Sequence, residues 1–391
     1  MPSRRSSLDQ RSRRLTALPI GRESTRDRVK NLPTIDELLA EVVAKGASDL
    51  HLKPGVAPML RIDSHLHPFE TTALDEVAVE RYLDAILPDR LQVEFKEYHE
   101  ADFAYGLASG DRFRVNAFRQ RGLITIAIRA IRKPEDSVEA LGMPPVVSRL
   151  AAELRGLVLV TGPTGSGKST TLSAVIDLIN RTRRVNIITI EDPVEVVHED
   201  QMSLVSQREV GVDTAGFGEA MRRVLRQDPD VILVGEMRDA ETVDAALKAA
   251  ETGHLVLSTL HTLDAAETIN RILEFFPGAR QNQVRRMLAG TLRGIISQRL
   301  LPRAYGEGRV PAVEVLINTE RVAERIADPD LTHELLEVVA EGAYYGMETF
   351  DQSLLRLVGT GVVTFEEALR HATKPTDLKL KAQQLGLVST E

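Results

Sequence analysis

Short apolar runs alternate with helical patterns through the central part of the chain. Four of these runs contain no charged residue: residues 157–160, 185–190, 231–234 and 255–260. Runs of this length and composition are typical of strands that are buried on both faces of a sheet. Helical spacing of apolar residues between them predicts crossover helices. The pattern therefore favours an α/β domain built on a parallel sheet.

The first run leads into a glycine-rich segment of the form G-x-x-x-x-G-K-S, and a helical pattern follows over 172–179. Glycines let backbone N–H groups turn inward around a polyphosphate, and the helix N-terminus adds positive potential. This order of strand, loop and helix predicts a nucleotide-binding P-loop. Lys168 would reach the β- and γ-phosphates of ATP, and the Ser169 hydroxyl would hold Mg²⁺. The predicted nucleotide-binding residues are Gly162, Pro163, Thr164, Gly165, Ser166, Gly167, Lys168, Ser169 and Thr170.

Carboxylates stand directly after the second and third runs. Because the carboxyl ends of parallel strands form the ligand crevice of such a sheet, we expect these side chains to face the nucleotide. Glu236 takes the place of the acid that supports Mg²⁺ in P-loop enzymes, whereas Asp230 precedes its strand and lies at the wrong end. Glu195 is the predicted general base for the attacking water, and Glu191 is the alternative base or a support for the metal.

Two histidines flank the fourth run, with His254 before it and His261 after it. Only the end of a strand lies at the nucleotide edge of the sheet. We therefore predict that His261 senses the γ-phosphate, and a functional role for His254 is a second hypothesis. An ordinary core position is the alternative for either histidine. Neither has the companion ligands that a metal site would require.

The pattern differs in the region 32–132. A capping box at Thr34 and Glu37 predicts a first helix that stops at Gly46, and a second helix is expected over 75–87. Strand-like segments occur at 48–52, 59–63, 101–105, 112–119 and 124–131. Region 32–132 is thus predicted to be a small α+β domain, and the proline-containing segment 133–145 a linker to an ATPase domain over 146–391.

Arginines crowd the last two predicted strands of the small domain. They either form ordinary solvated faces of a hairpin or reach the γ-phosphate bound to a neighbouring subunit. At the other end of the chain, the pattern from residue 265 onward is mostly helical. It predicts one long helix over 279–299 and one strand over 310–318.

Composition narrows the classes of function. The 391 residues suggest two or three domains, and the formal net charge of −8 argues against a nucleic-acid partner. The chain has no cysteine, which excludes disulfides and cysteine-bound zinc, and no apolar run is long enough to span a bilayer. We therefore expect a soluble, cytoplasmic protein.

Residues 1–31 combine many arginines with serines and few large apolar side chains. Such a segment cannot bury enough surface to order itself, so a disordered tail is expected. An electrostatic tether to anionic lipid or to an acidic partner is the alternative.

Four of the segments described above resemble the Walker A, Asp box, Walker B and His box of the secretion ATPase superfamily. They are residues 162–170, 190–195, 233–239 and 252–262. Within that superfamily the chain is similar to the type IV pilus retraction ATPases, the PilT-like family, over about residues 33 to 385. Segments 47–52, 211–217 and 378–381 match that family as well.

This resemblance implies a cytoplasmic motor ATPase that uses ATP and Mg²⁺ to drive type IV pilus retraction, the disassembly of the pilin filament in twitching motility. It implies a homo-hexameric ring of subunits with a PAS-like N-terminal domain, a RecA-like ATPase domain and the nucleotide between them. Arg112, Arg114 and Arg129 become candidates to complete the site. The implied partner is a platform protein of the inner membrane, which would hold the motor at the inner face of that membrane.

One element departs from the family pattern. Retraction ATPases carry A-I-R-N-L-I after an E-x-x-x-x-T segment, and here Ala323 and Glu324 stand at the positions of its arginine and asparagine. This element concerns the direction of work, so a pilus extension or type II secretion ATPase is an alternative. The absence of cysteine and the short N-terminal region argue against that alternative. A nucleotide-binding regulator with little hydrolysis is a third hypothesis, disfavoured by the intact P-loop lysine and strand-end glutamates.

Overall fold

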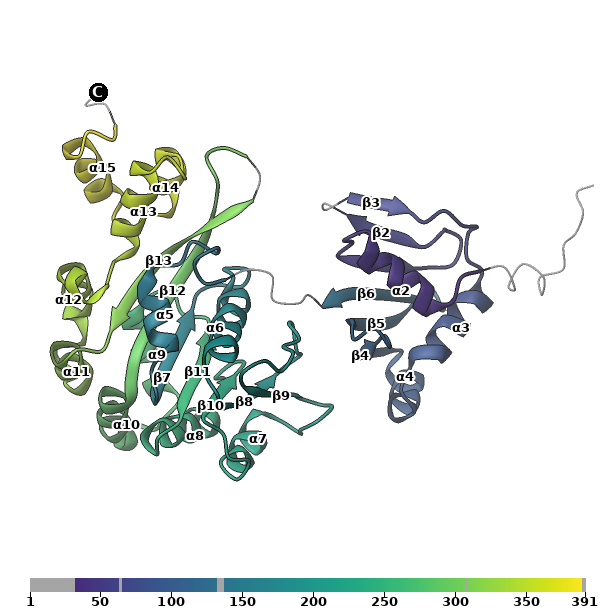
Figure 1. The fold of residues 1–391 in the computed structure, drawn as a ribbon, viewed down its shortest axis with the longest axis horizontal. Helices are drawn as coiled ribbons and strands as arrows, with labels where there is room; N and C mark the ends of the chain where they lie inside the picture. The colour runs from purple at the N-terminus through teal and green to yellow at the C-terminus, as the bar shows by residue number, and fades with distance from the viewer. Residues whose placement is uncertain (1–31, 63–64, 132–136, 307, 389–391) are drawn as a thin grey trace, which may run out of the picture. The chain divides into compact units, whose positions relative to one another are not determined.

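A computed structural model describes residues 32–62, 65–131, 137–306 and 308–388 (Figure 1). The chain divides between Ala130 and Ile131 into two compact units. The predicted tail at 1–31 and residues 133–136 of the predicted linker lie outside the described residues. Within the described part of the chain, no helix is both long and apolar enough to cross a membrane.

The N-terminal unit is a six-stranded sheet of spatial order β3-β2-β1-β6-β5-β4 that shares one hydrophobic core with its helices. Its α-helices are α2 (Ile35–Ala44), α3 (Glu76–Ile86) and α4 (Gln92–Tyr98), with a 3-10 turn η1 (Asp89–Leu91). Its strands are β1 (Asp49–Leu52), β2 (Met59–Ile62), β3 (His65–Pro68), β4 (Glu100–Gly106), β5 (Arg112–Gln120) and β6 (Leu123–Ile131). The capping box at Thr34 and Glu37 is confirmed, whereas β3 and α4 were not predicted.

The second unit contains a seven-stranded sheet of order β13-β12-β7-β11-β10-β8-β9. All neighbouring strands are parallel except β12 and β13. The strands are β7 (Gly156–Thr161), β8 (Asn186–Glu191), β9 (Leu204–Glu209), β10 (Val231–Val234), β11 (Leu255–Leu260), β12 (Leu292–Pro302) and β13 (Arg309–Ile317). The four predicted apolar strands are therefore the neighbours β7, β11, β10 and β8 in the middle of the sheet.

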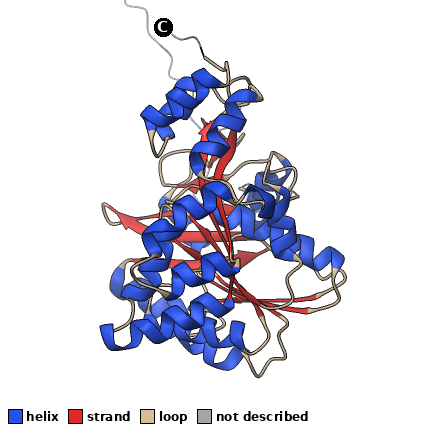
Figure 2. Cartoon of the chain, turned by 90° about the vertical axis from the view of Figure 1, so that its left-hand side faces the viewer, coloured by secondary structure: helices blue, strands red, loops and turns tan. Residues whose placement is uncertain are grey.

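Helices cover both faces of this sheet (Figure 2). Side chains of β7 alternate between two cores: Leu157 and Leu159 pack on one face, and Val158 and Val160 on the other. Helices α5 (Pro145–Ala151) and α6 (Lys168–Thr182) cover one face. Helices α7 (Phe217–Val224), α8 (Ala240–Glu251), α9 (Ala265–Glu274) and α10 (Gly278–Thr291) cover the other. Burial on both faces explains why these strands are continuously apolar in sequence.

The helix predicted over 279–299 is wrong in its second half. Helix α10 ends at Thr291, and β12 begins at the next residue and lies between β7 and β13. Its apolar residues Leu292, Ile295 and Ile296 follow one another three and one positions apart, which imitates helical spacing. Pairing with strands on both sides overrides this local signal.

The C-terminal helices contribute to two cores, the first two helices to a core of the large sheet and the last three to a smaller core. They are α11 (Glu320–Ala327), α12 (Leu335–Glu341), α13 (Phe350–Gly359), α14 (Phe365–His371) and α15 (Pro375–Gln384), with 3-10 turns η2 (Thr332–Glu334) and η3 (Ala343–Tyr345). Helices α13 to α15 pack around Leu301 of β12 and Val310 of β13. Figure 2 shows them gathered at one end of these two strands.

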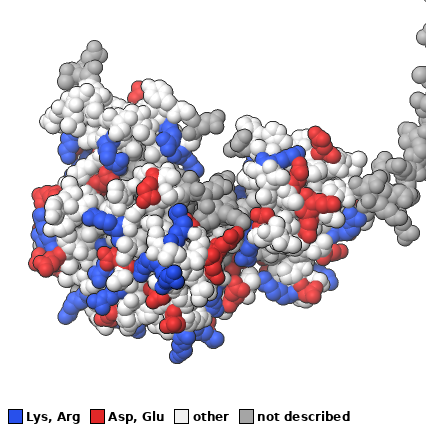
Figure 3. All heavy atoms as spheres, viewed as in Figure 1, with Lys and Arg blue, Asp and Glu red and all other residues white. Residues whose placement is uncertain are grey.

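Charged side chains of both signs are mixed over the surface of the second unit that Figure 3 displays. Lys and Arg alternate with Asp and Glu on this face. Charged side chains of this unit also form ion pairs, as in Lys248–Asp244 (2.7 Å) and Arg280–Asp244 (2.9 Å). Mixed surface charge of this kind favours solubility without steering one sign of partner.

Candidate active site

The P-loop and the ends of β8, β10 and β11 meet at one cavity of about 490 Å³. That volume is within the range of about 300–1,000 Å³ that is usual for ligand pockets. The predicted site residues that line it are Thr164, Gly165, Gly167, Lys168, Ser169, Thr170, Glu191, Glu195, Glu236 and His261. Gly162, Pro163 and Ser166 belong to the same loop but do not line the cavity.

Two glycines of the P-loop adopt backbone conformations that other residues rarely adopt, and both lie against β12. Gly162 has φ +144° and Gly167 has φ +90°, in the left-handed region that favours glycine. A Cβ atom at Gly162 would collide with the carbonyl oxygen of Gln298 and lie 2.6 Å from the Ser166 hydroxyl. A Cβ atom at Gly167 would lie 3.1 Å from Nε2 of Gln298. The loop conformation therefore depends on close contact with β12.

Gln298 on β12 supports the P-loop and was not predicted as a site residue. Its side chain is 1% exposed. Nε2 donates to the carbonyl of Ser166 at 2.6 Å, and Oε1 accepts from the Thr171 hydroxyl at 3.0 Å. One residue before Gln298 on β12, the Ser297 hydroxyl accepts a hydrogen bond of 2.8 Å from the Thr161 hydroxyl at the end of β7. Because the sequence pattern predicted a helix here, it gave no reason to place Gln298 beside the loop.

Lys168 lies at the first residue of α6 and is almost completely buried. Its Nζ donates to the carbonyls of Gly162 at 2.8 Å and Pro163 at 3.2 Å, and Nδ1 of His261 is 3.4 Å away. Burial lowers the pKa of Lys168, and the nearby charges of Glu236 and Glu195 oppose that effect. The ammonium group is thus held at the loop by weak partners that a phosphate oxygen could replace.

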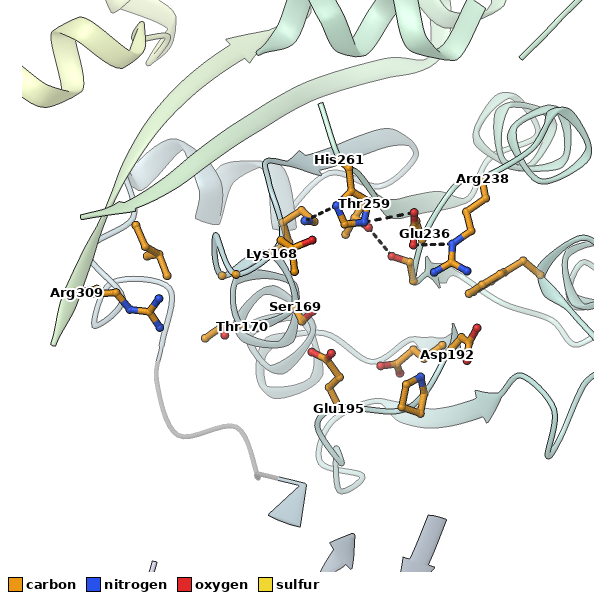
Figure 4. Close-up of a pocket in the computed structure, with 18 residues that line it drawn as sticks. Lys168, Ser169, Thr170, Asp192, Glu195, Glu236, Arg238, Thr259, His261 and Arg309 are labelled. Carbon is orange, nitrogen blue, oxygen red and sulfur yellow. Dashed lines mark hydrogen bonds and ion pairs between the residues drawn. The ribbon is translucent and has the colours of Figure 1, made fainter. Parts of the chain in front are cut away.

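His261, Glu236 and Arg238 continue this chain of contacts across the cavity (Figure 4). Nε2 of His261 lies 3.4 Å from Oε1 of Glu236, and Nε of Arg238 donates to Oε2 of Glu236 at 2.8 Å. The strand end itself is fixed by the Thr259 hydroxyl, which donates to the carbonyl of Gly235 at 2.6 Å. The histidine predicted to sense phosphate therefore contacts both the P-loop lysine and the predicted metal-supporting acid.

The two glutamates after β8 have different surroundings. Oε1 of Glu191 accepts from the Thr189 hydroxyl at 2.6 Å and from Nε2 of Gln207 at 3.1 Å, and burial raises its pKa. Glu195 is exposed, and in Figure 4 its carboxylate points toward the first turn of α6, where Ser169 lies. A free carboxylate facing the cavity is better suited to accept a proton than one already engaged in hydrogen bonds.

His254 is not brought to the cavity. It directly precedes β11, so it lies at the opposite end of that strand from His261. Its Nδ1 is 2.9 Å from the carbonyl of Ala249 and 3.3 Å from the Thr252 hydroxyl, so it fixes the turn between α8 and β11. The geometry of this unit gives a catalytic role for His254 no support.

The candidate arginines belong to the N-terminal unit. Nε of Arg129 donates to Asp49 at 2.8 Å, and Arg114 lies 4.0 Å from Asp102. Arg112 makes no ion pair among the described residues. Their contribution to the nucleotide site stays a prediction.

Two arginines that line the cavity were not predicted. Arg238 stands two residues after Glu236, so its position at a strand end was a usable signal. Arg309 reaches the cavity from the start of β13, far away in sequence, and nothing local marks it.

A P-loop on a doubly wound parallel sheet, with glutamates and a histidine at the adjoining strand ends, defines a nucleotide-binding ATPase site. Comparisons with known proteins agree. The family model described as Type II/IV secretion system protein matches residues 25–342. The chain therefore belongs to that family and is a P-loop ATPase.

The relatives are similar over most of their length. A type IV pilus retraction ATPase, PilT, from Pseudomonas aeruginosa is 46% identical, with 87% of this chain and 98% of that protein covered. A twitching motility protein from Neisseria gonorrhoeae is 43% identical, with coverage of 81% and 84%. A crystal structure of the pilus retraction motor PilT with bound ADP aligns with a TM-score of 0.82 at 42% identity, covering 89% of this chain and 100% of that one.

Proposed function

We propose that this chain is a motor that couples ATP hydrolysis to the retraction of a type IV pilus. The observation that supports it best is the single cavity that collects Lys168, Glu195, Glu236 and His261 in a chain 46% identical to a pilus retraction ATPase. A regulator with little hydrolysis would not need a free carboxylate beside the phosphate loop.

In the proposed mechanism the P-loop amides and Lys168 bind the β- and γ-phosphates of ATP. Ser169 and Glu236 offer a hydroxyl and a carboxylate to the same cavity, which are ligands that suit Mg²⁺. When bound there, Mg²⁺ would neutralise charge on the phosphate oxygens. His261 then lies between Lys168 and Glu236, where it can respond to the presence of the γ-phosphate.

Glu195 is the proposed general base. A water molecule forms a bond to the γ-phosphorus while its proton passes to the Glu195 carboxylate. The bond between the γ-phosphorus and the bridging oxygen breaks, and ADP leaves with that electron pair. Lys168 and Arg238 are placed to stabilise the negative charge that develops on the phosphate oxygens.

We further propose a cytoplasmic homo-hexamer that docks on a platform protein at the inner face of the cytoplasmic membrane. This proposal is supported by the family to which the chain belongs. A motor that acts on a pilus also has to contact the machinery at the base of the pilus. The candidate arginines of the N-terminal unit would contribute to the nucleotide site of a neighbouring subunit.

A deletion strain tests this proposal. The strain should keep surface pili but lose twitching motility, because filaments that cannot be retracted stay extended. Wild-type chain should restore motility, and Glu195→Gln chain should not. Pili are counted by electron microscopy and motility by the expansion of colonies. Loss of surface pili in the deletion strain would instead indicate an extension motor.

A further inference from the structure

Glu314 is a buried carboxylate that the hydrolysis mechanism does not use. It lies on β13 and is 3% exposed. Its Oε1 accepts a hydrogen bond of 3.0 Å from the backbone N–H of Ala265, the first residue of α9. N–H groups in the first turn of a helix have no partner inside the helix. Glu314 therefore supplies a partner that α9 cannot provide for itself.

The start of α9 is tied to the loop that carries His261. The hydroxyls of Thr262 and Thr268 are 2.7 Å apart, and the Thr268 hydroxyl donates to the carbonyl of Asp264 at 2.6 Å. The N–H of Leu263 donates to Oε2 of Glu267 at 2.7 Å. Every residue between His261 and Ala265 is thus bonded to α9, so a shift of the helix start would be passed to the loop that directly follows His261.

We propose that Glu314 is a positioning residue for hydrolysis, which acts by holding the N-terminus of α9 and thereby placing His261 between Lys168 and Glu236. Both contacts of His261 are 3.4 Å long, so a small shift of the loop removes them. The inference rests on the proposed role of His261.

The other side of Glu314 faces the C-terminal helices. It lines a cavity of about 110 Å³ together with residues of α12, α13 and α15. The charged groups around Glu314 are Asp264, Arg299, Asp351, Lys374, Asp377 and Lys381. A rearrangement of the C-terminal helices therefore changes the surroundings of the same carboxylate that holds α9. Through its bond to α9, Glu314 would couple the arrangement of these helices to the position of His261.

The test uses the full chain and steady-state hydrolysis of ATP. Glu314→Leu removes the acceptor and should lower kcat roughly fivefold or more with little change in the KM for ATP, because the P-loop is untouched. Glu314→Gln keeps an acceptor oxygen and should restore most of kcat. Glu348→Gln is the matched control, since Glu348 is a partly buried acid beside β13 that bonds Arg356 and, among the described residues, makes no hydrogen bond to α9.

A double-mutant cycle with His261→Asn decides whether Glu314 acts through the histidine. Glu314→Leu should lower kcat in the wild-type background and have almost no further effect in His261→Asn. Additive losses would overturn the inference while leaving the role of His261 intact. If His261→Asn alone kept full kcat, the proposed role of His261 and the inference would both fail.

If Glu314→Leu does not fold, Thr268→Val takes its place. It removes the hydroxyl bond between α9 and Thr262 at nearly constant volume. The same non-additivity with His261→Asn is expected, and independent effects would overturn the inference.

Discussion

Glu191 and Glu195 show how the surroundings of a side chain divide two roles that the sequence left open. Both stand at the end of β8, so their spacing alone could not rank them as bases. Glu191 is bonded to Thr189 and Gln207, whereas the Glu195 carboxylate lines the cavity and makes no hydrogen bond to the part of the chain that the structure describes. A strand end can be predicted from an apolar run, but the hydrogen bonds at that end depend on β9, which the sequence pattern did not reveal.

Replacement of Glu195 by glutamine tests the assignment of the base. Glu195→Gln should lower kcat for ATP by about 10²–10⁴-fold and leave nucleotide affinity nearly unchanged, because an amide cannot take the proton of the attacking water. Hydrolysis is followed by phosphate release, and affinity by titration with a fluorescent ATP analogue. Glu199→Gln on the same loop should behave like wild type. Near-normal turnover in Glu195→Gln would rule out this base.

Glu314 gives the ATPase unit a specific dependence of stability on pH. Burial raises its pKa from 4.5 to about 7. Between these two values the folded state keeps a proton that the unfolded state has lost, so the stability falls as the pH rises through this window. At about 1.4 kcal/mol per pKa unit, the loss reaches about 3 kcal/mol at pH 8.

Glu314→Gln should remove this loss. We compare the free energy of unfolding of the variant with that of wild type at each pH. This difference should favour the variant by about 3 kcal/mol more at pH 8 than at pH 5. Urea unfolding of the ATPase unit at the two pH values measures it. Glu366→Gln, at an exposed position on α14, serves as the control. The same difference between variant and wild type at both pH values would contradict the prediction.

At the scale of elements, β12 joins parts of the molecule that the sequence analysis treated separately. Gln298 contacts the P-loop, and the neighbouring Arg299 donates to the carbonyl of His371 at 2.6 Å and lies 4.0 Å from the centre of the Phe350 ring. Side chains on successive residues of a strand point to opposite faces. One strand thus contacts the nucleotide loop with one residue and the C-terminal helices with the next.

Gln298→Leu should weaken nucleotide binding. The variant leaves the buried carbonyl of Ser166 and the Thr171 hydroxyl without this partner. The loss destabilises the P-loop conformation that binds the nucleotide by about 1–3 kcal/mol. The dissociation constant for a fluorescent ADP analogue should rise roughly tenfold. Gln201→Leu removes an exposed amide of the same unit and should have no effect. Unchanged ADP affinity in Gln298→Leu would show that the loop keeps its shape without β12.

The elements that were predicted correctly are those whose signal is local. Buried strands β7, β8, β10 and β11 are continuous apolar runs, and the capped start of α2 is a short motif. The start of β12 was not predicted because its parallel partner β7 is distant in sequence and the local apolar spacing imitates a helix. Arg309 was lost for the same reason, since only the pairing of β13 with β12 brings it to the cavity.

At the scale of the whole molecule, the proposed hexamer would bring the arginines of one subunit to the nucleotide site of another. Arg112 and Arg114 lie on the same face of β5, opposite the buried Phe113 and Val115. Arg129 is bonded to Asp49, so it is less available than Arg112. In the proposed hexamer these arginines would stabilise the γ-phosphate held by a neighbouring subunit.

Mixed oligomers distinguish action in the same subunit from action in a neighbour. Glu195→Gln subunits lack the base but keep the arginines, and Arg112→Ala/Arg114→Ala subunits have the reverse defect. Each alone should hydrolyse little ATP. Co-expressed with different tags and purified on both, they should recover activity, because an arginine from the first kind can complete the site of the second.

Co-expression of Glu195→Gln with Lys168→Ala is the matched control, because both defects fall in the ATPase unit and no neighbour can repair either one. The rate of ATP hydrolysis should be higher in the mixture of Glu195→Gln with Arg112→Ala/Arg114→Ala subunits than in this control. If neither mixture recovers, the arginines act within their own subunit. If Arg112→Ala/Arg114→Ala is fully active alone, the N-terminal unit contributes no essential charge, and the stabilisation of the γ-phosphate falls to Arg238 and Arg309 of the ATPase unit.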